Sequence, residues 1–417
     1  MEAYSITGGN PLRGDVRVMG AKNAVLPLLA ACVLIREPVK LTGCPDLSDV
    51  SNMLRLLESL GCRTSRCGAD LYIDASGAQE HVMPQAISKR MRSSIFMLGP
   101  VLARFGRADF AYPGGCEIGL RPIDLHLQGL RALGAHIEEE HGHILCSGKL
   151  VGGSVHLDYP SVGATENVMM AAVCAQGDTV IHSAAREPEI VDLGNFLNAC
   201  GAKVRGMGTD TICISGGATL HGTVYAPLTD RIIAGTLLTA GAATQGDVFA
   251  RGARAEDLQA VLAKLREAGA EVQLMRDGVR VRMNGRPHAV RRVETAPFPG
   301  FPTDMQAQMM ALLALSRGTS VIAENVFENR MQHAAELMRM GADIQVSGRI
   351  AVVRGVERLS GARVMARDLR GGAALCIAAL AAQGESVVEN IALIDRGHDH
   401  LENMLNQLGA QIRRINE

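Results

Sequence analysis

A cysteine beside glycines is the first feature of this sequence that points to chemistry. Cys116 follows Pro113-Gly114-Gly115 and precedes Arg121 by five residues. Glycines allow a loop to hold a thiol clear of the backbone, and a nearby guanidinium favours the reactive thiolate form. Cys116 is therefore a candidate for proton transfer or nucleophilic chemistry. A loop cysteine without a role is the alternative reading.

Basic side chains gather where strand-like segments run into apolar helical patterns. Only six of the 42 basic residues are lysines, so Lys22 within Gly20-Ala21-Lys22-Asn23-Ala24 stands out. Four arginines share such junctions: Arg92, Arg330, Arg370 and Arg396. If they converge, their planar groups would form a clamp for carboxylate and phosphate. Otherwise Lys22 is an exposed first-turn helix residue and the arginines are solvated surface charges.

One acidic residue precedes an apolar helical pattern. Asp304 lies in Phe301-Pro302-Thr303-Asp304-Met305-Gln306. On spacing alone, the simplest role for Asp304 is a helix N-cap, which accepts hydrogen bonds from free backbone N–H groups. Helix N-termini also favour anions, so the junctions together predict an anionic ligand.

The elements that position these residues are repeated. Six times a leucine stands four residues before a glycine, Ala or Cys comes next, and Ile, Val or Thr stands three residues after the glycine. The glycines are Gly61, Gly134, Gly201, Gly269, Gly341 and Gly409, separated by 67 to 73 residues. Each copy predicts a helix, a glycine with positive φ and a β-strand. A unit of about 70 residues repeated six times therefore predicts an α/β fold.

Length and composition limit the remaining possibilities. A chain of 417 residues exceeds one ordinary core and divides most simply into two domains of three units, with a break near 228–231. The net charge of −1, the 3% aromatic content and the absence of Trp disfavour a nucleic-acid or membrane-surface binder.

The lack of membrane signals and the spacing of the cysteines both favour a reducing, cytoplasmic location. The sequence shows no leader pattern and no apolar run of the roughly 20 residues that span a bilayer, so we expect a cytoplasmic protein. The ten cysteines form no CxxC and no zinc-like cluster, so most are expected to be small core residues in a reducing compartment.

Six motifs in order resemble the UDP-N-acetylglucosamine 1-carboxyvinyltransferase family of enolpyruvyl transferases. The resemblance runs from about residue 4 to residue 414 without a large insertion. The motifs are Gly20-Ala21-Lys22-Asn23-Ala24, Pro113-Gly114-Gly115-Cys116 with Arg121-Pro122, Ser161-Val162-Gly163-Ala164-Thr165, Ala185-Arg186-Glu187-Pro188-Glu189-Ile190, Phe301-Pro302-Thr303-Asp304-Met305-Gln306 and Phe327-Glu328-Asn329-Arg330.

The resemblance implies an inside-out α/β barrel of two domains, each built from three α/β units. It implies that residues 21–229 form one domain, that 1–20 and 230–417 form the other, and that the active site lies in the cleft between them. The implied reaction moves the enolpyruvyl group of phosphoenolpyruvate to the 3′-hydroxyl of UDP-N-acetylglucosamine and releases phosphate, as the first committed step of peptidoglycan precursor synthesis. No metal or cofactor is expected, and a monomer is expected.

The resemblance also assigns residues to roles. Those implied to hold phosphoenolpyruvate are Lys22, Asn23, Arg121, Arg330, Arg370 and Arg396. Those implied to hold the UDP-sugar are Asn23, Arg92, Arg121, Pro122, Ile123, Asp124, Leu125, Ser161, Val162, Gly163, Asp304, Val326 and Phe327. The implied catalytic set is Cys116, Asp304, Lys22, Arg396 and Asp368. Asp304 would be the base, Cys116 the proton donor or product-release thiol, and Glu187 a support for the cysteine loop. How Cys116, Asp304 and Asp368 divide the proton transfers stays open.

The chain departs from the family pattern at one point. Tyr159-Pro160 stands where some members carry a lysine that touches the diphosphate. We therefore expect backbone N–H groups near Ser161–Gly163 to make more of that contact.

Three alternatives remain. They are a shikimate-pathway enolpyruvyl transferase, which the Pro-Gly-Gly-Cys loop disfavours, a non-catalytic UDP-sugar-binding paralogue, and a nucleic-acid end-processing enzyme. The presence of Lys22, Cys116, Asp304 and Arg396 disfavours the second, and the balance of 42 basic against 43 acidic residues disfavours the third.

Overall fold

The computed structural model describes residues 2–89, 91–114 and 123–416. These residues divide into two compact units. The terminal unit comprises residues 2–19 and 229–416, and the central unit comprises residues 20–89, 91–114 and 123–228. Each unit has its own large hydrophobic core.

The central unit alternates short strands with helices. Its strands are β3 (Val39–Leu41), β4 (Arg63–Cys67), β5 (Asp70–Asp74), β6 (Val82–Met83), β7 (Arg107–Ala111), β8 (His136–Glu140), β9 (His143–Ser147), β10 (Ser154–His156), β11 (Asp178–His182), β12 (Lys203–Arg205), β13 (Thr211–Ser215) and β14 (Val224–Tyr225). Its helices are α1 (Lys22–Ala31), η1 (Cys32–Leu34), α2 (Ser48–Ser59), α3 (Gln85–Ser88), η2 (Arg92–Met97), α4 (Leu98–Phe105), α5 (Asp124–Ala132), α6 (Val162–Ala172) and α7 (Pro188–Ala199).

The terminal unit follows the same plan. Its strands are β1 (Glu2–Thr7), β2 (Arg13–Arg17), β15 (Asp247–Arg251), β16 (Glu271–Met275), β17 (Gly278–Arg282), β18 (Arg292–Glu294), β19 (Thr319–Ala323), β20 (Asp343–Ser347), β21 (Ile350–Arg354), β22 (Arg363–Met365), β23 (Glu385–Glu389) and β24 (Gln411–Asn416). Its helices are α8 (Arg231–Ala243), α9 (Ala255–Glu267), η3 (Thr303–Met305), α10 (Gln306–Leu313), α11 (His333–Arg339), α12 (Leu369–Ala381), η4 (Ile391–Leu393) and α13 (Leu401–Gln407).

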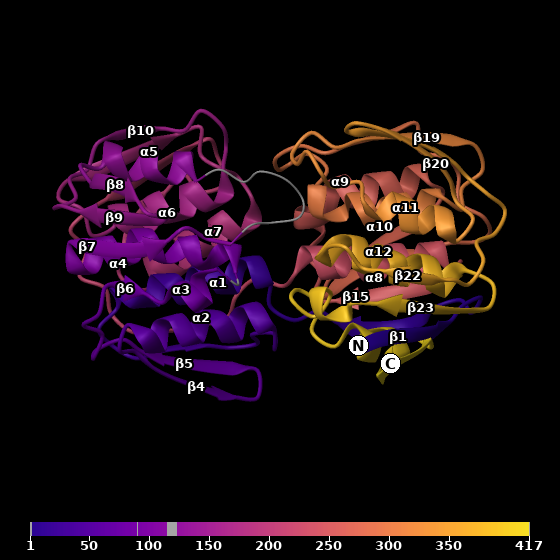
Figure 1. Ribbon diagram of the computed structural model, residues 1–417, viewed down its shortest axis with the longest axis horizontal. Helices are drawn as coiled ribbons and strands as arrows, with labels where there is room; N and C mark the ends of the chain where they lie inside the picture. The colour runs from indigo at the N-terminus through magenta and orange to yellow at the C-terminus, as the bar shows by residue number, and fades with distance from the viewer. Residues whose placement is uncertain (1, 90, 115–122, 417) are drawn as a thin grey trace. The chain divides into compact units, whose positions relative to one another are not determined.

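Six four-stranded sheets of one topology are present in the described residues. The orders are β14-β3-β5-β4, β6-β7-β9-β8 and β10-β11-β13-β12 in the central unit, and β2-β15-β17-β16, β18-β19-β21-β20 and β22-β23-β1-β24 in the terminal unit. In every sheet the first two strands pair in parallel and the rest pair antiparallel. The chain begins and ends in one sheet, because β1 pairs with both β23 and β24 (Figure 1).

The repeat glycines act as predicted. All six have φ between 89° and 100°, and each lies between a helix and a strand. Only glycine adopts this left-handed conformation without strain, so the chain can reverse there from an outer helix into the sheet. The predicted sixfold α/β repeat is confirmed.

The most apolar helices lie inside each unit. Twelve of the 13 residues of α8 are buried, and α8 packs against α10 and α12. Figure 1 shows these helices between sheets of the terminal unit, and α1, α4 and α6 are the corresponding buried helices of the central unit. A helix that is apolar on all sides must be covered on all sides. Sheets therefore surround helices, and the predicted inside-out α/β barrel is confirmed.

Within the described ranges, none of the helices has both the length and the apolar character needed to cross a membrane.

Candidate active site

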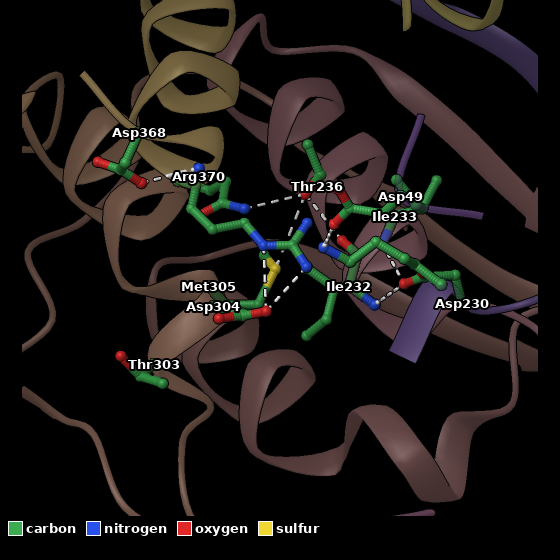
Figure 2. Close-up of polar contacts among 12 residues, drawn as sticks. Asp49, Asp230, Ile232, Ile233, Thr236, Thr303, Asp304, Met305, Asp368 and Arg370 are labelled. Atoms are coloured by element: carbon green, nitrogen blue, oxygen red, sulfur yellow. Dashed lines mark hydrogen bonds and ion pairs between the residues drawn. The ribbon is translucent and has the colours of Figure 1, made fainter. Parts of the chain in front are cut away.

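The terminal unit brings one carboxylate and two arginines together. Arg330 donates from Nη2 to Asp304 Oδ1 at 2.7 Å and from Nη1 to Thr303 Oγ1 at 2.9 Å. Arg370 donates from Nε and Nη2 to Asp304 Oδ2 at 3.1 and 2.8 Å. Figure 2 shows the Arg370 guanidinium directed at Asp304 from the start of α12. Two of the four junction arginines thus converge on one acidic residue.

This cluster is buried, and its charges control its protonation. The side chains of Arg330 and Arg370 are 6% and 3% exposed. Burial opposes ionisation of Asp304, but Arg370 and Arg330 outweigh it and hold the pKa of Asp304 well below its ordinary value. Burial also lowers the pKa of Arg330, but Asp304, with Asp368 and Glu324, more than compensates, so that the pKa rises. The reading of these two arginines as solvated surface charges is therefore wrong.

The simpler reading of Asp304 as a helix N-cap is also wrong. Asp304 lies inside η3, where Pro302 precedes the first helical residue and no side chain caps it. Two other aspartates cap helices of the terminal unit: Asp368, whose Oδ1 accepts from the N–H groups of Arg370 and Gly371, and Asp230 at the start of α8. Asp368 therefore fixes the backbone from which Arg370 reaches Asp304.

A buried glutamate holds the segment next to this cluster. Glu324 Oε1 accepts from the N–H groups of Val326 and Phe327 at 2.9 and 3.1 Å, and Oε2 accepts from Thr303 Oγ1 at 2.8 Å. The Phe327 ring lies 5.2 Å from the Arg330 guanidinium carbon, in the range of a cation–π contact. Glu324 thus connects Val326 and Phe327 to the Asp304 cluster.

Several polar atoms in this region are buried without a hydrogen-bond partner among the described residues, and two groups concern the site directly. They are Arg370 Nη1 and both ring nitrogens of His333. Burial lowers the pKa of His333 to about 4, and Arg330 adds to the effect while Asp368 opposes it. His333 is therefore neutral near pH 7. An unmatched guanidinium N–H is a donor prepared for an anionic ligand.

The central unit contributes a lysine at a helix start. Lys22 is the first residue of α1, and its Nζ lies 3.4 Å from Asp49 Oδ2. The side chains of Lys22 and Asp49 are 12% and 4% exposed, so Lys22 is not the exposed first-turn residue of the simpler reading. Asn23 follows Lys22 and is partly buried.

The other predicted residues of the central unit lie at helix starts. Ser161 is the N-cap of α6, and its Oγ accepts from Ala164 N–H at 3.4 Å. The N–H groups of Val162 and Gly163 have no acceptor among the described residues and lie at the positive end of an 11-residue helix. Arg92 begins η2. Asp124 and Leu125 begin α5 after the buried Ile123.

The remaining predicted site residues are Glu187, Arg396, Cys116, Arg121 and Pro122. Glu187 is the buried N-cap residue of α7. Arg396 is partly exposed and lies after η4. Cys116, Arg121 and Pro122 lie outside the described residues. Among the described residues, no three His, Cys, Asp or Glu side chains form a group that could hold a metal ion.

Sequence reasoning missed Asp49, Glu324 and His333. Asp49 gave one weak signal, since it is an acidic residue in the first turn of α2. Glu324 and His333 gave none, because a single polar residue in an apolar pattern does not reveal which distant group it faces.

Comparison with known proteins assigns this chain to a family. The family model described as EPSP synthase (3-phosphoshikimate 1-carboxyvinyltransferase) matches residues 6–405. UDP-N-acetylglucosamine 1-carboxyvinyltransferase 2 of Caldanaerobacter subterraneus subsp. tengcongensis is 49% identical over 416 residues, covering 100% of both chains. UDP-N-acetylglucosamine 1-carboxyvinyltransferase 1 of Carboxydothermus hydrogenoformans is 50% identical over 417 residues, covering 100% of this chain and 99% of the relative.

Solved structures share the fold. The enolpyruvyl transferase NikO from Streptomyces tendae matches with a TM-score of 0.88 and 25% identity, covering 100% of this chain and 99% of that chain. EPSP synthase from Acinetobacter baumannii matches with a TM-score of 0.77 and 18% identity over 100% of both chains, which shows the fold alone. The resemblance found in the motifs is confirmed, and this chain belongs to the EPSP synthase (3-phosphoshikimate 1-carboxyvinyltransferase) family of enolpyruvyl transferases.

Proposed function

We propose that this enzyme transfers the enolpyruvyl group of phosphoenolpyruvate to the 3′-hydroxyl of UDP-N-acetylglucosamine and releases phosphate. One observation carries the proposal: two relatives named for this activity are 49% and 50% identical to the chain over its full length. The proposal places the enzyme at the first committed step of peptidoglycan precursor synthesis, as a cytoplasmic monomer.

The reaction needs proton transfer and charge stabilisation. A bond forms between the sugar 3′-oxygen and C2 of phosphoenolpyruvate while the hydroxyl proton passes to a base, the C2–C3 double bond becomes single and C3 gains a proton. C3 then loses a proton and the bond from C2 to the phosphate oxygen breaks. Atoms balance with inorganic phosphate as the only other product, so acid–base groups and fixed cations are sufficient.

Arg330 and Arg370 are proposed to bind the carboxylate of phosphoenolpyruvate. Both are buried, and both donate to Asp304. The unmatched Nη1 of Arg370 offers a further donor. A substrate carboxylate that accepts these hydrogen bonds would compete with Asp304 for the same two guanidiniums.

If the substrate carboxylate displaces Asp304 from the two arginines, Asp304 can act as the base. Paired with two arginines, its carboxylate has a pKa far too low to take a proton from a hydroxyl. Transfer of the arginines to the substrate would raise that pKa and free an oxygen for the 3′-hydroxyl. Basicity would then appear only when phosphoenolpyruvate is bound.

The UDP-sugar is proposed to use the helix starts of the central unit. The free N–H groups of Val162 and Gly163 suit a diphosphate, because helix N-termini bind anions. This supports the expectation that backbone groups bind the diphosphate in a chain that has Tyr159-Pro160 in place of a lysine. The other proposed contacts are Asn23, Arg92, Arg121, Pro122, Ile123, Asp124, Leu125, Ser161, Asp304, Val326 and Phe327.

The phosphate of phosphoenolpyruvate is assigned to Lys22, Arg121 and Arg396. The Lys22–Asp49 pair is largely buried, which strengthens the attraction between the two groups. We propose Cys116 as the proton donor or product-release thiol. Asp368 is proposed to assist proton transfer through Oδ2, because its Oδ1 caps α12.

The second candidate is transfer to shikimate 3-phosphate. The name of the matching family model favours it, whereas the names of the two relatives at about half identity do not. The deciding experiment measures phosphate release from purified protein with phosphoenolpyruvate and either acceptor, without added metal. We expect release only with UDP-N-acetylglucosamine. Turnover with shikimate 3-phosphate instead would reject the proposal.

A further inference from the structure

Helix α6 carries a buried amide that connects three segments of the central unit. Asn167 is fully buried. Its Oδ1 accepts from Gly99 N–H in the first turn of α4 at 2.7 Å, and its Nδ2 donates to Ile95 O of η2 at 3.0 Å. The same Nδ2 lies 2.8 Å from His126 Nδ1 on α5. One side chain thus joins α6 to η2, α4 and α5.

These elements approach one another closely at two glycines. A Cβ atom on Gly99 would lie 2.4 Å from the backbone oxygen of Asn167. A Cβ atom on Gly163 would lie 2.9 Å from Cε1 and 3.2 Å from Nε2 of His126. The imidazole therefore packs directly against the first turn of α6. Small shifts of the ring must move that turn, because packed interiors do not deform freely.

The hydrogen bonds determine the tautomer of His126. Gly99 N–H is a donor and fixes which end of the Asn167 amide is oxygen. The NH₂ group then faces Ile95 O, His126 Nδ1 and, at 3.5 Å, Gly163 O. Because an NH₂ group only donates, His126 Nδ1 must accept. His126 therefore carries its ring proton on Nε2, the nitrogen on the Gly163 side.

The connected segments carry the proposed UDP-sugar contacts. Arg92 begins η2, Asp124 and Leu125 begin α5, and Ser161 to Gly163 begin α6. Resting on the proposed function, we infer that Asn167 and His126 are positioning residues that fix these three helix starts for the UDP-sugar, with His126 held as the Nε2–H tautomer.

The chain provides a matched control for Asn167. Asn198 on α7 also makes two side-chain hydrogen bonds in the central unit, donating to Val204 O at 2.9 Å and accepting from Val204 N–H at 2.7 Å. Asn198 joins α7 to β12 and touches none of the three helix starts. Asn167→Asp puts an acceptor against Ile95 O and His126 Nδ1, whereas Asn198→Asp makes the same chemical change elsewhere.

Calorimetric titration with UDP-N-acetylglucosamine tests the positioning role. We expect Asn167→Asp to weaken binding about 10- to 100-fold, to raise KM for this substrate more than it lowers kcat, and to leave KM for phosphoenolpyruvate unchanged. Asn198→Asp should bind like wild type. Equal affinities for wild type and folded Asn167→Asp would overturn the inference.

A second pair of variants tests the same contact in case Asn167→Asp does not fold. His126→Asn keeps an acceptor at the position of Nδ1 and should retain near wild-type affinity. His126→Leu removes the acceptor and should lose affinity. Equal affinities for these two variants would contradict the role of the Asn167–His126 contact.

The tautomer gives a readout that does not depend on the proposed function. Two-bond ¹⁵N–¹H spectra of the unliganded protein should show His126 with an unprotonated Nδ1, assigned by the signals that disappear in His126→Leu. A protonated Nδ1 would overturn the inference. An unprotonated Nδ1 in a protein that does not bind UDP-N-acetylglucosamine would instead reject the proposed function and the ligand assigned to this pair.

Discussion

Arg370 donates two hydrogen bonds to Oδ2 of Asp304, at 3.1 and 2.8 Å, across 66 residues of sequence. Arg330 contacts the other carboxylate oxygen, so one acidic residue pairs with two buried cations. In this state Asp304 is an internal ligand that occupies the place proposed for the substrate carboxylate. Loss of that ligand should therefore have opposite effects on stability and on substrate affinity.

Asp304→Asn is expected to destabilise the free protein and to tighten phosphoenolpyruvate binding. Two buried guanidiniums without a carboxylate cost about 3–5 kcal/mol. Without the competing carboxylate, phosphoenolpyruvate should bind more tightly and restore much of the missing stability, while turnover disappears. Thermal unfolding with and without phosphoenolpyruvate measures both effects. Weaker binding by the variant would refute the competition between Asp304 and substrate.

The control for this change is Asp247→Asn. Asp247 accepts hydrogen bonds from Arg280 at 2.6 and 2.7 Å, but the Arg280 side chain is 45% exposed. An exposed pair contributes about 0–1 kcal/mol. We expect little change in stability and none in phosphoenolpyruvate binding. A loss as large as that of Asp304→Asn would mean that burial is not the cause.

His333 should make the fold sensitive to acid. Its pKa is 6.5 when unperturbed and about 4 in the folded protein. Because the folded state disfavours the proton, stability is present above pH 6.5 and is lost as the pH falls towards 4. The linked loss is roughly 3 kcal/mol. Urea unfolding from pH 7 to pH 4 should show a smaller decrease for His333→Met than for wild type, and parallel curves would exclude this role.

The repeat could be predicted from sequence because its signals are local. A leucine in the last helical turn, a glycine with positive φ and a following strand all lie within a few residues, and they recur six times. The burial of helices α8 and α12 could be predicted from local sequence too, because both are rich in Ala and Leu along their whole length.

The contacts of the site could not be predicted in this way. Motif resemblance selected Asp304, Arg330 and Arg370, but no spacing shows that both arginines contact one carboxylate. Glu324 joins Thr295, Thr303 and the Val326–Phe327 backbone through contacts that span up to 29 residues. Such contacts depend on how strands and helices of a repeat pack, and this geometry leaves no mark on sequence periodicity.

Glu166 should weaken the fold as the pH rises. It is fully buried on α6, and neither carboxylate oxygen has a hydrogen-bond partner among the described residues. Burial first, and then Glu189 and Glu187, raise its pKa well above the ordinary value of 4.5. A raised folded pKa gives stability that is complete below pH 4.5 and is lost as the pH rises through the folded pKa.

Glu166→Gln removes this titration and should be more stable than wild type at pH 8, by about 1–3 kcal/mol. The advantage should shrink as the pH approaches 5. Chemical unfolding at both values measures it, with Glu80→Gln as an exposed control. An advantage that does not change with pH would show that Glu166 is not protonated in the fold.

Nine cysteines provide an internal comparison for Cys116, which lies outside the described residues. Burial raises the pKa of seven of them, for example to about 12 for Cys44 and Cys200 and about 11 for Cys62. Cys67 and Cys213 are the exposed ones among the nine. They are therefore the thiols that compete with Cys116 for an electrophile.

Fosfomycin, an epoxide phosphonate that inhibits family members with this cysteine, should alkylate Cys116 in preference to Cys67 and Cys213. The phosphonate would occupy the proposed phosphate site at Lys22, Arg121 and Arg396, so that the thiolate opens a nearby epoxide and the released oxygen takes a proton. UDP-N-acetylglucosamine should accelerate labelling. Cys116→Asp should abolish labelling while keeping appreciable turnover, because a carboxylic acid also donates protons. Peptide mass mapping decides: comparable labelling of Cys67 or Cys213, or none on wild type, would reject a reactive Cys116.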